Sequence, residues 1–385
     1  MFIKNAKIYT MAGKVLENGC ILIENGKIKN VGENIECNDS NVIDANGGTV
    51  IPGMIDAHCH IGIIEGSKGF EGSDVNEMTD PITPHLRAID GVYPFDEYFP
   101  KAVKAGVTTV MTGPGSANVI GGQFIAMKTY GTNVDRMVVL EPAAMKIAFG
   151  ENPKRVYNGK NKMPMTRMAT AALLRQTLIE AKNYKLKKEK ALEKGEHFDI
   201  NIKMESLIPV IDKKMVLKAH CHRADDILTA IRVAKEFDVN LTLDHCTEGH
   251  LITEYIKEAK VPAIVGPTMS FNSKIELINK SFTTPSTLIK AGIKVAIMTD
   301  HPVIEIQYLP ICAGLAAKEG DITFEEALST ITINAAEILG VDDRIGSIEI
   351  GKDADIVILD GSPFDLTSNT LYTIINGEIV YRQTK

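Results

Sequence analysis

The segment VIPGMIDAHCH, which covers residues 50–60, contains the most informative pattern in the chain. Its closely spaced apolar residues are typical of a short buried strand, and the strand ends in two histidines, His58 and His60. Side chains alternate between the two faces of a strand, so these two imidazoles point the same way. Histidine is the commonest metal ligand, and two of them supply half of a metal site. For an isolated pair, packing is the better explanation, so the interpretation depends on the rest of the chain.

The same kind of strand recurs through the middle of the chain. Short runs rich in valine, isoleucine and methionine alternate with helical patterns at 224–237, 251–260 and 285–292. This alternation predicts parallel strands joined by right-handed crossovers. We therefore predict an α/β fold in which residues 51–342 form a (β/α)8 TIM-like barrel, with functional residues at the C-terminal ends of its strands. The runs are GVTTVMTG, MVVLEPAAM, MVLKAH, VNLTLDH, VPAIVG and KVAIMTD.

The two ends of the chain have a different pattern. Residues 1–50 and 343–385 contain runs of alternating apolar and polar residues, with turn signals at Asn25-Gly26 and Asn376-Gly377. Chain termini often lie close together, so one small β-sandwich domain built from both segments is predicted. Residues 61–100 are too long for an ordinary strand–helix loop and are predicted to be an insertion in the barrel.

Two other stretches stand out from the barrel pattern. Residues 113–123, GPGSANVIGGQ, are rich in glycine but lack the spacing of a phosphate-binding loop, so we expect a structural loop. Residues 182–197 are dense in charge, but lysines alternate with glutamates, which favours a solvated helix face over a nucleic-acid site.

Composition excludes several classes of protein. The chain has 385 residues, 42 Lys and Arg against 49 Asp and Glu, and a net charge of −7, which argues against a nucleic-acid partner. No apolar run approaches the roughly 20 residues that a membrane span requires, and the N-terminus lacks the apolar stretch of a signal peptide. Six cysteines without a CxxC pair argue against a disulfide framework. We expect a cytoplasmic protein with a small-molecule substrate.

Other strands of the predicted barrel end in the same residue types as residues 50–60. MVLKAHCH ends in His220 and His222, VNLTLDH ends in His245, and KVAIMTD ends in Asp300. Neighbouring strands of a barrel bring their ends together, so these side chains should converge to within metal-binding distance. His222 lies one step past its strand, where it could contact substrate or serve packing or capping.

VIPGMIDAHCH after a β-rich start, together with the closing segment GSIEIGKDADIVILD, resembles the amidohydrolase superfamily over essentially the whole chain. The imidazolonepropionase-like and dipeptidase-like branch is the most similar. The resemblance implies a metal-dependent hydrolase barrel that binds one or two divalent ions, with zinc expected and manganese, iron or nickel as alternatives. It implies these ligands: His58, His60, His220, His245 and Asp300.

The resemblance also implies a ligand at the end of the fourth strand. Many members with two metals use a lysine carbamate, formed with CO2, and Lys146 is the candidate. Glu141 on the same strand and a single-metal site are the alternatives. A lysine reacts with CO2 only when its amine is neutral, which burial beside other cations favours.

The implied reaction is hydrolysis of a C–N bond in an amide, cyclic amide or dipeptide. A metal-bound hydroxide attacks, and Asp300 moves a proton from the water to the leaving nitrogen. A heterocycle deaminase on the same scaffold is the first alternative, although residues 220–225 lack its acid–base glutamate. A catalytically silent scaffold is the second. A homo-oligomer is expected for a barrel of this kind.

Three cysteines follow histidines directly and could suggest a mixed site. Alternation along a strand places Cys59 and Cys221 on the face opposite the histidines, and Cys246 should also point away. We therefore expect buried packing residues and a ligand set of nitrogen and oxygen only.

Overall fold

The structure, a computed structural model, describes residues 1–36, 40–66 and 68–384, so Cys37 lies outside the described part. One eight-stranded sheet forms the barrel, in the order β13-β12-β11-β10-β9-β8-β7-β6. Its strands are β6 (Met54–Cys59), β7 (Val107–Thr112), β8 (Ile120–Lys128), β9 (Val138–Ala148), β10 (Val216–Cys221), β11 (Leu241–His245), β12 (Ala263–Val265) and β13 (Val295–Ile297). The predicted α/β fold with a TIM-like barrel is confirmed.

Backbone hydrogen bonds join the two ends of this sheet. The N–H of His60 donates to the carbonyl of His301 (2.9 Å), and the N–H of Asp300 donates to that of His58 (3.2 Å). The segment after β13 is thereby held against β6. This contact brings the first and last predicted ligands of the chain side by side.

One strand departs from a regular (β/α)8 pattern. β8 runs antiparallel to both β7 and β9, whereas the other neighbouring pairs in the barrel are parallel. The loop predicted at 113–123 therefore ends earlier, because residues 120–123 belong to β8. Glycine is required there: Gly122 has φ 132°, and a Cβ at this position would lie 2.6 Å from the carbonyl oxygen of Leu86 in the insertion. The strand was missed because glycines selected for this close approach also resemble a loop.

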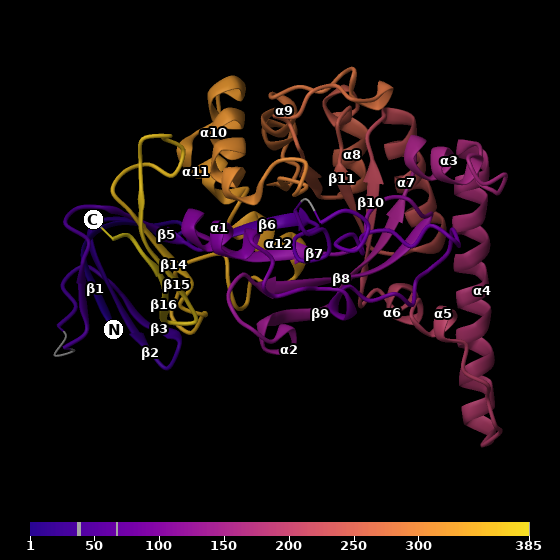
Figure 1. Cartoon of the computed structure of the whole chain (residues 1–385), viewed down its shortest axis with the longest axis horizontal. Coiled ribbons are helices and arrows are strands. Elements are labelled where there is room, and N and C mark those ends of the chain that lie inside the picture. Colours follow the sequence, from indigo (N-terminus) through magenta and orange to yellow (C-terminus); the bar gives the residue numbers. More distant parts are fainter. Residues whose placement is uncertain (37–39, 67, 385) are drawn as a thin grey trace.

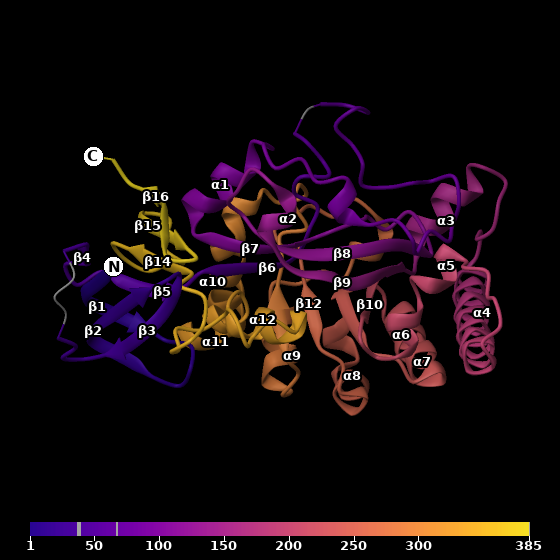
Figure 2. The ribbon, with the colours of Figure 1, turned by 90° about the horizontal axis from the view of Figure 1, so that it is seen from below.

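Helices cover the outside of the barrel (Figures 1 and 2). In α7, the buried residues Ile227, Ala230, Val233, Ala234 and Phe237 recur at helical spacing and face the barrel core. The α-helices are α1 (Tyr98–Ala105), α2 (Val134–Met137), α3 (Glu151–Asn158), α4 (Arg167–Lys194), α5 (Ile202–Glu205), α6 (Ile208–Ile211), α7 (Ala224–Phe237), α8 (Thr253–Ala259), α9 (Thr284–Lys290), α10 (Leu309–Gly320), α11 (Phe324–Ser329) and α12 (Ile333–Leu339). The short 3-10 helices are η1 (Ala88–Asp90), η2 (Gly249–Leu251), η3 (Ile275–Leu277) and η4 (Ile306–Tyr308).

The charge-dense stretch belongs to α4, a 28-residue helix that projects from the body of the molecule (Figure 1). It begins at Thr166, whose side chain accepts a hydrogen bond from the N–H of Ala169 (3.1 Å), and it ends before Gly195, which has φ 68°. Within the described ranges, no helix combines the length and apolar character that crossing a membrane requires.

A second eight-stranded sheet has strands from both ends of the chain, in the order β16-β15-β14-β5-β1-β2-β3, with β4 paired to β1. Asn25 and Asn376 form its tight turns with φ 51° and 50°. It lies at the opposite end of the molecule from α4 (Figures 1 and 2). The strands are β1 (Phe2–Tyr9), β2 (Val15–Glu24), β3 (Lys27–Gly32), β4 (Val42–Asp44), β5 (Thr49–Pro52), β14 (Ile356–Leu359), β15 (Thr370–Ile375) and β16 (Glu378–Arg382). The division into domains at 1–50 with 343–385 and at 51–342 stays a prediction.

Candidate metal centre

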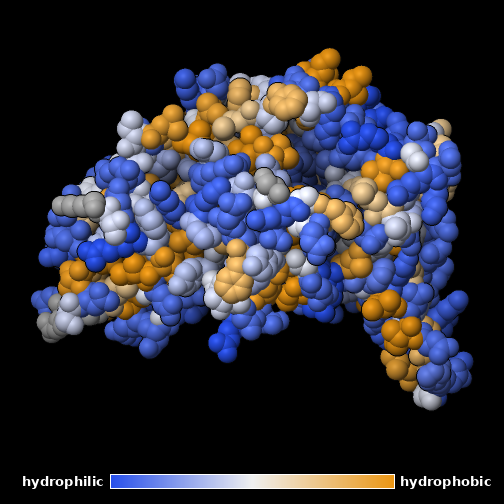
Figure 3. Space-filling model, viewed as in Figure 1, coloured by the Kyte–Doolittle hydropathy of each residue, from blue (hydrophilic) through white to orange (hydrophobic). Residues whose placement is uncertain are grey.

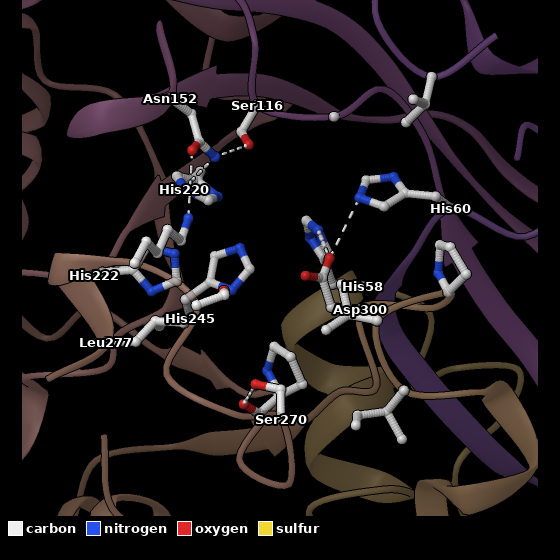
Figure 4. Close-up of a pocket in the computed structure, with 18 of the residues that line it drawn as sticks. His58, His60, Ser116, Asn152, His220, His222, His245, Ser270, Leu277 and Asp300 are labelled. Atoms are coloured by element: carbon white, nitrogen blue, oxygen red, sulfur yellow. Dashed lines mark hydrogen bonds and ion pairs between the residues drawn. The ribbon is translucent and has the colours of Figure 1, made fainter. Parts of the chain in front are cut away.

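A cavity of about 830 Å3 opens at the C-terminal ends of the barrel strands (Figure 4). Every residue predicted for the site lines it, and most of these side chains are almost completely buried. They come from β6, β9, β10 and β11 and from the segments that follow β6, β10 and β13. The seven residues are His58, His60, Lys146, His220, His222, His245 and Asp300.

One half of the centre is a group of two histidines and a carboxylate. Oδ1 of Asp300 lies 3.3 Å from Nε2 of His60 and 3.4 Å from Nε2 of His58. The possible ligand atoms of these three residues all lie within 4.8 Å of one another. Burial by itself would raise the pKa of Asp300, but the contacts with the two histidines hold it well below its usual range. Asp300 is therefore ionised and able to bind a cation.

The other half consists of His220, His222 and His245, whose possible ligand nitrogens also lie within 4.8 Å of one another. Their rings are 4.3 to 4.7 Å apart between centroids and face the same space (Figure 4). Burial lowers the pKa of all three, in the case of His245 to about 3. They are therefore neutral, with lone pairs available. Nε2 of His222 is buried without any hydrogen-bond partner among the described residues.

Neighbouring groups fix the orientation of several rings. Nδ1 of His60 donates to the carbonyl of Gly113 (2.7 Å), and Nδ1 of His245 donates to the carbonyl of Gly266 (2.9 Å). In His245, whose pKa is lowered, the proton therefore sits on Nδ1, and Nε2 offers a lone pair to the cavity. Oδ2 of Asp244 lies 2.8 Å from Nδ1 of His58 and favours the same tautomer there.

Lys146 lies between the two groups. Its Nζ is 3.3 Å from Nε2 of His58, and its charge acts on both His58 and His245 by lowering their pKa values. Burial lowers the pKa of Lys146 to about 8, with the charge of Lys218 acting in the same direction and that of Asp244 opposing it. Close to neutral pH, an appreciable fraction of this amine is uncharged.

Backbone strain is concentrated at the same place. His245 has φ 68°, the adjacent Cys246 has φ 48°, and Asp300 has φ 54°. Residues other than glycine seldom adopt this left-handed conformation, and it costs about 1–3 kcal/mol each. Two candidate ligands from different strands both adopt it, which is typical of side chains held in place for function.

Glu141, the alternative to Lys146, is not among the residues that line the cavity. It pairs instead with Arg87 of the insertion, with the nearer nitrogen 2.9 Å from Oε1. The three cysteines Cys59, Cys221 and Cys246 are free, completely buried and part of the hydrophobic core. The prediction that they pack rather than line the site is confirmed.

Sequence reasoning left several parts of the site unassigned. Asn152 donates to Ser116 (2.7 Å) and its Nδ2 lies 3.3 Å from Nε2 of His220. Lys218 contacts Asp244 at 3.3 Å and, with His58, holds the pKa of that buried carboxyl well below its usual range. Lys218 lies two residues before His220 on β10, and Asp244 lies directly before His245 on β11. Alternation along β10 could have placed Lys218 on the same face as His220.

Comparison with known proteins gives a consistent result. Residues 49–380 match the model of the amidohydrolase family. An amidohydrolase from Thermotoga maritima has a solved structure that is 44% identical in sequence, with a TM-score of 0.96, and the similarity covers 99% of this chain and 100% of the other.

Curated relatives are more distant in sequence. An imidazolonepropionase from Thermoplasma volcanium is 26% identical over 96% of this chain and 92% of its own length. A protein named amidohydrolase tasK, from Hapsidospora irregularis, is 28% identical over 93% of this chain, which spans only 39% of that protein. The family match, which extends over most of the chain and agrees with the barrel and its histidines, shows that the chain belongs to the amidohydrolase family, whose relatives hydrolyse C–N bonds of small molecules.

Proposed function

We propose that this chain is a metal-dependent hydrolase whose centre holds two divalent ions and cleaves the C–N bond of an amide, cyclic amide or dipeptide. One observation carries the proposal: two groups of three possible ligands converge on one cavity, with Lys146 between them.

The donor set fits such ions. His220 and His245 are neutral, Nε2 of His222 lacks a hydrogen-bond partner among the described residues, and Asp300 is ionised. His58, His60 and Asp300 would hold one ion, and the histidines of β10 and β11 the other. A divalent ion supplies Lewis acidity there, which lowers the pKa of a water and polarises the substrate carbonyl. Nitrogen and oxygen donors are suited to zinc, our first choice, and also to manganese, iron or nickel.

Asp300 has the position of a proton carrier. Its carboxylate faces the cavity beside His58 and His60 and is ionised, so an oxygen is available to take a proton from the attacking water. The same oxygen can then deliver this proton to the nitrogen that leaves.

Lys146 is the proposed bridge, as a carbamate formed with CO2. Its amine is buried between the two groups, and its pKa of about 8 leaves part of it neutral and nucleophilic. Carbamylation would replace a cation by an anion in a place where two cations are to bind.

His222 has two candidate roles, third ligand of the second ion or contact with substrate. The ring centroids of His245 and His220 lie 4.4 and 4.7 Å from that of His222, which favours a role as metal ligand. The role predicted from the sequence is contact with substrate. Loss of one ion in His222→Ala would assign it to the metal, whereas lower turnover with unchanged metal content would assign it to substrate.

A deaminase is the alternative on this scaffold. The group of three histidines alone would hold a single ion, as a one-metal deaminase requires. Among the described residues that line the cavity there is no glutamate to act as acid and base, which disfavours this reading.

The test is the metal content of the purified protein together with its activity. Two ions per chain, and hydrolysis of N-acyl amino acids, dipeptides or cyclic imides by zinc- or manganese-loaded protein, are expected. One ion per chain with ammonia released from heterocyclic amines would favour the deaminase. No turnover in either panel by fully loaded protein would favour the silent scaffold.

We also propose a homo-oligomer, with the cytoplasm as its location. Apolar side chains are exposed on the projecting part of α4, where Leu186 and Leu192 are 53% and 65% exposed (Figure 3). Light scattering should give a mass above that of one chain, and Leu186→Glu with Leu192→Glu should lower it.

A further inference from the structure

Two cations line the cavity in addition to the proposed ligands. Arg155 comes from α3, and Lys274 lies directly before η3. In the described part of the chain, neither forms an ion pair with a carboxylate. Asp300 is the one carboxylate among the described lining residues, and it faces His58 and His60. The wall that carries Arg155 and Lys274 therefore has two positive charges that form no ion pair within the described residues.

This wall is directly connected to the proposed metal centre. Nζ of Lys274 donates to Oδ1 of Asn152 (3.4 Å), and Nδ2 of the same amide lies 3.3 Å from Nε2 of His220. One side chain thus separates Lys274 from a candidate metal ligand. A group bound by Lys274 would belong to the same small molecule whose bond is cleaved.

The segments that carry the two cations are held together by Glu276, which is 1% exposed. Its Oε1 accepts the backbone N–H of Glu151 at the start of α3 (2.6 Å) and the guanidinium of Arg167 (3.1 Å). Gly150 allows this approach, because a Cβ there would lie 2.4 Å from Oε1. α3 and the segment at Lys274 are therefore fixed relative to each other, so the backbone positions that carry the two cations are set before any ligand binds.

We propose that Arg155 and Lys274 form an anion subsite, and that the substrate carries a carboxylate close to the C–N bond that is cleaved. This inference rests on the proposed hydrolytic function and specifies its substrate class. A guanidinium pairs with the two oxygens of a carboxylate in a planar, bidentate geometry, and an ammonium adds a point charge. Met269, Phe271 and Leu277 add an apolar wall, which suits an aliphatic or aromatic side chain on the same molecule.

The electrostatics of Lys274 agree with this assignment. Burial lowers its pKa, and the charge of Arg155 acts in the same direction, while Glu276, Glu151 and Asp300 oppose them. A bound anion would relieve the repulsion between the two cations.

The experiment compares matched pairs that differ only in charge: N-acetyl-L-methionine with its carboxamide, and N-acetyl-L-phenylalanine with its carboxamide. Turnover and calorimetric binding are both measured on zinc-loaded protein, with Arg155→Gln, Lys274→Gln and the control Lys154→Gln. Lys154 lies on the same helix as Arg155 but does not line the cavity, so its variant makes the same change in net charge.

We expect the wild type to prefer the carboxylate, and each subsite variant to reduce this preference about 10- to 100-fold, mainly through KM or Kd. Lys154→Gln should retain the preference. Hydrolysis without preference in the wild type, or an unchanged preference in both subsite variants, would overturn the subsite and leave the hydrolase intact.

The binding measurements can also support the anion subsite while contradicting the proposed hydrolytic activity. Selective binding of the carboxylate that both subsite variants lose, without any turnover, would support the subsite and count against the proposed activity. Binding of inorganic phosphate that both subsite variants lose, with no binding of either carboxylate, would overturn the carboxylate assignment.

Discussion

Nζ of Lys146 lies 3.3 Å from Nε2 of His58, although the two residues are 88 positions apart in the sequence. Lys146 is on β9, and His58 is on β6, on the other side of the antiparallel strand β8 and its neighbour β7. The contact therefore depends on the closed form of the barrel. It also places a buried amine with a lowered pKa next to a ring that would bind metal.

Replacing Lys146 by methionine should abolish the bridge while keeping the buried stem of the side chain. We expect the variant to bind fewer ions per chain and to lose at least about 100-fold in kcat, because a ligand shared by two ions is absent. Metal analysis and turnover of the loaded protein measure this, with Lys154→Met as the surface control. Full metal content and normal turnover in Lys146→Met would contradict the role of the lysine.

Much of the barrel could be predicted from the sequence, because its signals are local. The helix at 224–237 is recognised from the spacing of its apolar residues, and the structure has it at the same residues, Ala224–Phe237. His58, His60, His220, His245 and Asp300 were identified from strand ends, since parallel strands present their C-terminal ends at one rim.

Features that depend on contact between distant segments could not be predicted. β8 contains glycines because the insertion approaches it at Leu86, and the sequence of the strand does not reveal that neighbour. Arg155 and Lys274 are 119 positions apart in the sequence, yet they line the same cavity, and Glu276 joins the segments that carry them. The local sequence pattern contains no information on contacts between segments that are distant in the sequence.

Replacing Asp300 by asparagine tests its role as proton carrier. Asp300 has φ 54°, a conformation that asparagine tolerates well, so the backbone should be retained. We expect kcat to fall about 100- to 10,000-fold, because the amide cannot accept the proton.

The matched control for this variant is Asp321→Asn. Asp321 is exposed, caps the C-terminus of α10 and has φ 51°. Its replacement by asparagine therefore removes the same charge from a residue with a similar backbone conformation that does not line the cavity. Its kcat and metal content should equal those of the wild type. Retention of full turnover in Asp300→Asn would contradict the mechanism.

Replacing Cys59 or Cys221 by alanine distinguishes packing from ligation. Both thiols are completely buried, and burial raises the pKa of each well above its usual range, so they are neutral packing groups. We expect a loss of about 1–2 kcal/mol in the free energy of unfolding from the small cavity created, with unchanged metal stoichiometry. Urea denaturation and metal analysis give the two readouts, and Cys20→Ala, at a partly exposed site, should change neither. A lost ion in Cys59→Ala or Cys221→Ala would show that sulfur is a ligand.

The metal-free protein should lose stability as the pH falls below about 6.5. Burial lowers the pKa of His58, His220, His222 and His245 in the folded state, so these rings stay neutral while those of the unfolded chain take up protons. The unfolded state therefore binds more protons between the unfolded value of about 6.5 and, for His245, the folded value of about 3, and stability rises with pH in this window.

Four buried carboxyls among the described residues act in the opposite sense, because burial raises the pKa of Asp56, Asp96, Asp226 and Glu276. Burial raises the pKa of Asp56 to about 7, so between its unfolded value of 3.8 and pH 7 the folded state retains a proton that the unfolded state releases. Six histidines with lowered pKa values act against these carboxyls, since burial lowers the pKa of His85 and His301 as well as those of the four above. The net effect of acidification from pH 7 to pH 5 should be a lower free energy of unfolding, which urea denaturation of the metal-free protein measures.

His245→Gln should make this pH dependence shallower, because glutamine takes up no proton in either state. His197→Gln is the control, since the ring of His197 is exposed to solvent, so the slope of this variant should equal that of the wild type. Bound zinc would compete with protons for the same nitrogens, so loading should raise the stability most at pH 7 and least at pH 5. Equal or greater stability of the metal-free protein at pH 5 would show that the buried histidines are not neutral in the fold, and would count against their readiness to bind metal.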